Sequence, residues 1–130
     1  MDQESRNRMG AGGRKPESLL PLKELDRLLL LSLEGALQHG YRLLTGVAER
    51  SGGFVAPGPA SLYRALSGLE SAGVLEEAQG FAAADSGDAR RKYFRLTPFG
   101  RAVLRAELSR LAALLADARG QGIRFEGGGR

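Results

Sequence analysis

The sequence predicts a mainly α-helical domain that carries one small β-hairpin. Leucines recur at spacings of three and four residues in several segments, and glycine or proline separates these segments. In one short stretch, residues 90–96, two sets of side chains instead alternate along the chain, which is typical of a strand. With 130 residues, the chain is long enough for one domain with a core of its own.

The first helix is expected over residues 21–34. Leu22, Leu25 and Leu29 belong to a broad apolar stripe, which neighbouring leucines widen to almost the whole circumference. A helix that is apolar nearly all round must be covered on more than one side. We therefore expect this helix to pack on its own domain and also on a second subunit.

A second helix is expected over residues 39–50, because Gly35 ends the first helix and the Ser-Gly-Gly sequence at 51–53 ends this one. Its spacing predicts an inward-facing set that consists of Tyr41, Leu44, Val47 and Ala48. A loop through Pro57 leads from this helix to a third one, and two short helices joined by a turn make a helix-turn-helix arrangement.

A third helix begins at Pro59, since proline suits the first helical position. Leu62, Leu66 and Leu69 form one apolar stripe, and Gly73 closes the segment as a left-handed C-cap. The opposite face is small, polar and nearly free of acids; it carries Ala60, Ser61, Arg64, Ser67 and Ser71. A helix that enters a DNA major groove needs such a face, although an ordinary surface helix fits the same pattern.

A β-hairpin, or wing, is expected between the third helix and the last one. Residues 74–84 precede a polar turn at 85–88, and residues 90–96 follow it. In the second strand two sets of side chains alternate, Lys92, Phe94 and Leu96 against Arg91, Tyr93 and Arg95. The acidic residues of the turn would be repelled by phosphate, so the tip itself is not expected to touch DNA.

The last helix starts with Thr97 as its N-cap and Pro98 in its first turn, and it is expected to end near Arg119. Spacings of four, three, four and three define a short coiled-coil-like seam: Leu104, Leu108, Leu111, Leu115 and Ala118. The seam extends beyond the hairpin, where little of the same chain is left to cover it. We expect it to pack on a second copy of the chain.

These elements divide the chain into four parts: a disordered tail at 1–18, a winged helix-turn-helix DNA-binding domain at 19–97, a dimerisation helix at 98–120 and a flexible tail at 121–130. The net charge is +4, and residues 79–130 hold ten bases against five acids. This concentration of positive charge suggests a polyanion as the partner.

Composition argues against several classes of protein. The chain has no cysteine and one histidine, so we expect no disulfide, metal site or cofactor. It contains neither a Gly-x-Ser-x-Gly nucleophile elbow nor a phosphate loop, and it is not expected to be an enzyme. It has no segment typical of a signal peptide and no apolar run of the ~18 residues that a membrane span needs, which favours a cytoplasmic location.

Three groups of segments occur in a particular order: Leu33-Glu34-Gly35 with His39-Gly40-Tyr41, residues 58–66 with 69–75, and residues 90–100. With this order the chain resembles the PadR family of bacterial transcription regulators, and specifically its compact branch with a single C-terminal dimerisation helix. The resemblance implies a homodimeric DNA-binding repressor. Three residues separate Gly35 from His39, where family members often have two. The chain also lacks the tryptophan on which some drug-sensing members build an effector pocket between subunits.

The residues expected to contact DNA come from the second helix, the third helix and the wing: His39, Tyr41, Pro59, Ala60, Ser61, Tyr63, Arg64, Arg90, Arg91 and Lys92. Arg64 can donate two hydrogen bonds to guanine or one to a phosphate. Tyr63 is expected either to pack or to reach a phosphate through its hydroxyl. The alternatives are a solvated Arg64, a partly buried His39 and a solvated run of wing bases.

The dimer interface is expected to combine residues of the first and last helices: Leu22, Leu25, Leu29, Leu104, Leu108, Leu111 and Leu115. Two recognition helices about 34 Å apart meet successive major grooves, which predicts a palindromic operator. Two other functions stay open. One is a protein-interaction winged helix that does not bind DNA, and the other is a repressor that senses a small apolar ligand at the dimer interface.

Overall fold

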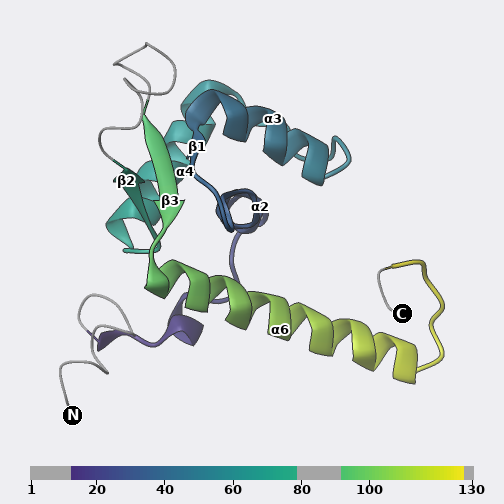
Figure 1. The fold of residues 1–130 in the computed structure, drawn as a ribbon. Coiled ribbons are helices and arrows are strands. Elements are labelled where there is room, and N and C mark those ends of the chain that lie inside the picture. Colours follow the sequence, from purple (N-terminus) through teal and green to yellow (C-terminus); the bar gives the residue numbers. More distant parts are fainter. Residues whose placement is uncertain (1–12, 79–91, 128–130) are drawn as a thin grey trace.

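The computed structural model describes residues 13–78 and 92–127. The elements follow in the order η2 (Pro16–Leu19, a 3-10 helix), α2 (Glu24–Leu33), β1 (Gln38–His39), α3 (Gly40–Arg50), α4 (Pro59–Ser71), β2 (Leu75–Ala78), β3 (Tyr93–Leu96) and α6 (Pro98–Gly120), as labelled in Figure 1. This arrangement confirms the mainly helical fold with a small antiparallel sheet. The predicted turn at 85–88 lies outside the described residues.

The sheet has three antiparallel strands in the order β1-β3-β2. Leu75 pairs with Leu96 and Ala78 with Tyr93, as a hairpin requires, and His39 pairs with Tyr93 on the other side. The sequence predicts the hairpin but not β1, because two residues are too few to carry an alternating pattern. Pairing with β3 makes this short segment a strand, and it joins the start of α3 to the wing.

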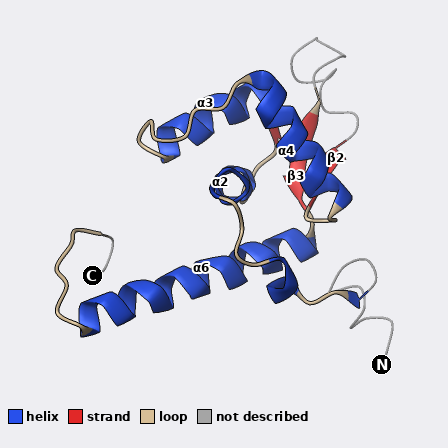
Figure 2. Cartoon of the chain, turned by 180° about the vertical axis from the view of Figure 1, so that it is seen from behind, coloured by secondary structure: helices blue, strands red, loops and turns tan. Residues whose placement is uncertain are grey.

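Helix α2 lies in the middle of the molecule, between α3 and α6 (Figures 1 and 2). It contacts α3, α4, α6 and β3, and both Leu29 and Leu30 are completely buried. The chain itself therefore covers most of the apolar surface that had suggested a second subunit over this helix, and only Leu25 and Leu31 stay partly exposed. The helix also begins at Glu24, three residues later than expected, because Lys23 has an extended backbone.

Helix α3 buries a different face from the expected one. Gly40, Leu43 and Val47 point inward, whereas Tyr41 is 71% exposed. The prediction of Tyr41 as a core residue is therefore wrong, while Val47 is confirmed. The two candidate faces differ by a rotation of one residue, and contact with α2 and α4 selects the one that contains Leu43.

The chain before α2 packs on the body of the domain, although residues 13–18 were expected to belong to a disordered tail. The guanidinium of Arg14 lies 5.4 Å from the centre of the Phe99 ring and donates a hydrogen bond to the Ala72 carbonyl. The 3-10 helix η2 contacts α6. A cation over an aromatic face is attractive, which gives this polar segment a partner that its composition does not predict.

Helix α6 begins as predicted, with the Thr97 hydroxyl accepting the Gly100 amide at 2.9 Å. Its first half buries Phe99, Val103 and Leu104 against the domain. Its second half extends away from the other helices (Figure 1), and Leu108 and Leu115 are exposed there. In the described part of the chain, no helix is both long and apolar enough to cross a membrane.

Candidate DNA interface

Three elements meet at one end of the molecule, where α3 and α4 begin (Figure 2). His39, at the start of α3, pairs with Tyr93, and Tyr93 in turn pairs with Ala78 at the end of β2. Tyr63, near the start of α4, packs on Gly40. The first turns of α3 and α4 and the base of the wing thus form one contiguous surface.

His39 shapes the start of α3. Its Nδ1 accepts the backbone N–H of Arg42 at 3.3 Å, so the imidazole acts as the N-cap of the helix. The ring also meets the Tyr93 ring edge to face, with the centroids 5.4 Å apart. The sequence left a partly buried histidine and a phosphate contact as alternatives. The imidazole is partly buried, and its contact with a phosphate stays a prediction.

Tyr63 holds α4 against the start of α3. A Cβ added at Gly40 would overlap the Tyr63 hydroxyl, so only glycine allows the ring to approach this closely. The Tyr63 side chain nevertheless stays 46% exposed. Tyr63 therefore packs against the start of α3, which was one of the two expectations for it. Part of its side chain remains accessible to a ligand on this surface.

The outer face of α4 is open, as predicted. Leu62, Leu66 and Leu69 are buried, while the residues on the other side are exposed: Pro59, Ala60, Ser61, Arg64 and Ser67. Gly58 is the N-cap and provides no side-chain oxygen for the first amides of the helix. Backbone N–H groups at a helix start that lack such a cap are good partners for a phosphate. At the other end, Gly73 has a φ of +82°, which confirms the left-handed C-cap.

Only part of the wing can be placed. Lys92 is exposed, and Arg90 and Arg91 lie outside the described residues. Arg95 is exposed too, but its Nε donates to Glu76 Oε2 at 2.8 Å across the hairpin. Tyr93 is buried together with Phe94, so the strand does not alternate as the sequence predicts. The Tyr93 ring packs against the His39 ring.

Arg42 was not among the residues predicted for this interface. It is exposed in the first turn of α3, next to the exposed Tyr41. The signal was present in the sequence, because a basic residue follows directly after the His-Gly-Tyr segment at a helix start.

The leucines predicted for a dimer interface fall into two groups. Leu22, Leu29 and Leu104 are buried within the protomer core. Leu25 and Leu111 are partly exposed, and Leu108 and Leu115 are exposed, as is the neighbouring Leu114, which was not predicted. The protomer thus leaves apolar surface open mainly on the second half of α6.

Glu107 marks the place where α6 leaves the body of the domain. Its carboxylate is buried and accepts hydrogen bonds from Arg110 Nε and Arg27 Nε, each at 2.9 Å. These bonds, chiefly the one from Arg110, lower the pKa of Glu107 to about 2. The ion pair with Arg27 ties α6 to α2. The described residues contain no cluster of three or more potential metal ligands.

Comparison with known proteins agrees with this architecture. No curated protein matches the chain. Among solved structures, a PadR family transcription regulator from hypervirulent Clostridium difficile is 24% identical, with a TM-score of 0.65 over 75% of this chain and 97% of that one. A transcriptional regulator from Clostridium thermocellum is 20% identical, with a TM-score of 0.60 over 77% of this chain and 90% of the other. The transcriptional regulator BldR from Sulfolobus solfataricus is 24% identical, with a TM-score of 0.56 over 88% and 68%.

These structures share the winged-helix fold. The sequence itself matches the family model described as the transcriptional regulator PadR-like family over residues 29–106, which is more than half of the chain. The matched region runs from the middle of α2 through the first half of α6, and so it contains the whole surface formed by α3, α4 and the wing. On this match, the chain belongs to the PadR-like family of transcriptional regulators.

Proposed function

We propose that this protein is a cytoplasmic repressor that binds a palindromic DNA operator as a homodimer, and that it acts by occupying DNA rather than by catalysis. One observation carries the proposal. The open face of α4, the uncapped amides at its start and the exposed first turn of α3 lie on one contiguous surface, to which the wing contributes Lys92.

In this proposal α4 enters the major groove. Arg64 and Ser61 face the base edges, Arg64 as a donor to guanine or to a phosphate. The start of α3, with His39 and Tyr41, lies along the backbone. The wing bases Arg90, Arg91 and Lys92 contact phosphates or the minor groove.

The second half of α6 supplies the surface for a second copy. Leu108, Leu111 and Leu115 remain at least partly exposed, and isolated soluble monomers rarely keep such a stripe uncovered. Leu25, the other partly exposed leucine predicted for the interface, lines a groove of about 470 Å³ between α2 and α4 that Ser61 and Arg64 also line, so it lies on the side proposed to meet DNA. A two-fold axis lets one patch cover itself and presents two copies of α4 to successive major grooves.

A titration of duplex DNA at several salt concentrations tests the proposal. Affinity is expected to fall with salt, by roughly 0.9 units of log affinity per log unit of salt for each phosphate neutralised. Replacing Arg90, Arg91 and Lys92 together with alanine is expected to reduce this slope by about two to three units. No binding to random duplex at low salt would favour the protein-interaction alternative instead.

Arg64→Ala tests the specific part of the proposal on an operator found by footprinting the protein's own promoter. Discrimination between operator and random DNA is expected to fall by roughly 1–3 kcal/mol if Arg64 makes a bidentate contact with guanine. Arg105→Ala is the matched control, because it removes a guanidinium that is also exposed but lies on α6. An equal loss on both DNAs would make Arg64 a phosphate contact.

A further inference from the structure

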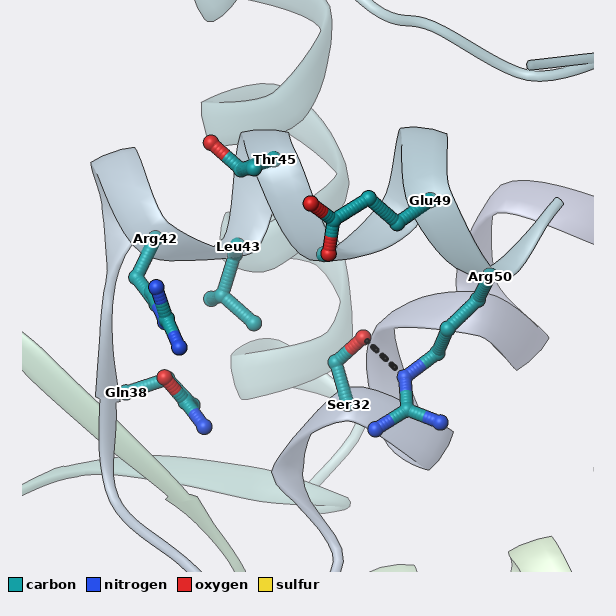
Figure 3. Close-up of a pocket in the computed structure, with 8 residues that line it drawn as sticks. Ser32, Gln38, Arg42, Leu43, Thr45, Glu49 and Arg50 are labelled. Carbon is teal, nitrogen blue, oxygen red and sulfur yellow. Dashed lines mark hydrogen bonds between the residues drawn. The ribbon is translucent and has the colours of Figure 1, made fainter. Parts of the chain in front are cut away.

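A polar hollow of about 350 Å³ lies between α2 and α3 (Figure 3). Three elements contribute to it: Ser32 comes from α2, Gln38 from β1, and the remaining residues from α3. None of its polar side chains was predicted as a site residue from the sequence. Arg42, Thr45, Glu49 and Arg50 are exposed, so the hollow opens to solvent along α3, while Ser32 forms its buried side.

Ser32 and Arg50 form one end of the hollow. Ser32 is 6% exposed, and its Oγ accepts a hydrogen bond from Arg50 Nε at 3.2 Å. Among the described residues, its own hydroxyl hydrogen is donated to no acceptor. The Ser32 hydroxyl hydrogen and the remaining N–H groups of the Arg50 guanidinium are donors to which the described residues offer no acceptor, and such donors suit an anionic oxygen.

Arg42 and Gln38 form the other end. Figure 3 shows the guanidinium of Arg42 next to the Gln38 amide, across Leu43 from the Ser32–Arg50 pair. Arg42 and Arg50 are eight residues apart on one helix, which corresponds to about 12 Å along its axis. A single phosphate or carboxylate therefore does not reach both ends, and a ligand that uses the whole hollow must be elongated.

The middle of the hollow is open for a specific reason. Gly46 has no side chain there, and a Cβ at this position would lie 3.4 Å from Ser32 Oγ. Glu49 is the only acid among the lining residues. A carboxylate in the middle disfavours a second negative charge beside it but accepts hydrogen bonds from hydroxyl groups.

These features select one ligand chemistry. A phosphate monoester fits the hydroxyl and guanidinium of Ser32 and Arg50. Sugar hydroxyls fit Glu49, and a planar base fits the Arg42 guanidinium by stacking and the Gln38 amide by hydrogen bonding. We propose that the hollow between α2 and α3 binds a nucleoside monophosphate, with the phosphate at Ser32 and Arg50 and the base at Gln38 and Arg42.

NMR titration of the full chain with adenosine 5′-monophosphate tests this proposal in the absence of DNA, independently of the proposed repressor function. Saturable shifts are expected for the Arg42 and Arg50 Nε–H groups and for the backbone amides of Ser32 and Gly46. Adenosine alone and inorganic phosphate alone are each expected to bind at least about tenfold more weakly, since each occupies one end only.

Three variants sharpen the test. Arg50→Gln is expected to weaken binding at least about tenfold, because a charge-assisted contact is lost. Gly46→Ala places a methyl group in the hollow while favouring the helix, so it is expected to weaken binding several-fold without lowering Tm. Arg119→Gln is the matched control and is expected to change nothing, because Arg119 lies over Phe125 at the far end of α6.

The proposal is wrong if ~10 mM nucleotide, a concentration that detects even millimolar affinity, produces no saturable shifts at these groups. It is also wrong if Arg50→Gln binds as tightly as the parent protein. Random duplex DNA is the final comparison, because its backbone carries the same phosphate chemistry. If duplex shifts these groups and the mononucleotide does not, the hollow contacts a DNA backbone rather than a free nucleotide.

Discussion

Helix α2 and the second half of α6 are both rich in leucine at helical spacing, yet the protomer buries the leucines of α2 far more completely. Leu29 in α2 is fully buried by the chain's own helices, whereas Leu115 in α6 is 47% exposed. From the patterns alone, both were expected to contact a second subunit, and the first helix was expected to pack on its own domain as well. Leucine periodicity predicts that a helix face is buried, but it does not predict whether the same chain or a second copy buries it.

The largest effect on stability is expected from Leu29→Ala in α2, compared with Leu115→Ala in α6. Leu29→Ala is expected to lower the free energy of unfolding by roughly 2–5 kcal/mol, because it leaves a cavity in a packed core. Leu115→Ala is its matched control and is expected to change the stability of an isolated protomer by less than about 0.5 kcal/mol. Urea denaturation at low protein concentration measures both. Equal losses of unfolding free energy in the two variants would contradict the conclusion that the protomer buries only the α2 leucine.

An intermediate effect is expected at Glu107, which lies at the boundary between the buried and projecting halves of α6. Glu107→Gln is expected to destabilise the protein by about 1.5–3 kcal/mol at neutral pH, because it removes charge-assisted hydrogen bonds to Arg110 and Arg27.

The pH dependence gives an independent check on Glu107. Its folded-state pKa of about 2 lies below the usual 4.5, so folding favours the charged form. The stabilisation is complete above pH 4.5 and is lost as the pH falls from there towards 2. Urea denaturation at pH 7 and pH 3 is therefore expected to show a smaller gap between parent and Glu107→Gln at pH 3. A gap that does not change with pH would mean that the carboxylate charge contributes nothing.

The smallest effect on the protomer fold, but a large one on assembly, is expected from Leu108→Glu combined with Leu115→Glu. Both side chains are exposed, so the helix content measured by circular dichroism is expected to remain. Charges in an apolar interface are costly, so sedimentation is expected to show monomers where the parent protein shows dimers. A parent protein that is monomeric at micromolar concentration would refute the proposed dimer and the palindromic operator with it.

Much of the fold followed from signals that act within one turn of helix. Pro59 at a helix start, Gly73 at a helix end and Thr97 as an N-cap each satisfy or avoid backbone hydrogen bonds of their immediate neighbours. Such signals depend on no distant residue. For the same reason the stripe of Leu62, Leu66 and Leu69, and with it the open outer face of α4, was predicted correctly.

Tertiary structure decided everything that depends on partners far away in the chain. The choice of Leu43 over Tyr41 as the inward face of α3, the strand at Gln38 and His39, and the packing of Arg14 on Phe99 all require an element remote in sequence. The hollow around Ser32 arises in the same way, since it exists only where α2 and α3 meet. The sequence by itself determined the helices, their caps and the open face of α4, because hydrogen bonding and helical period are local. Which leucines the protomer buries was decided by the tertiary structure, because burial depends on what lies opposite.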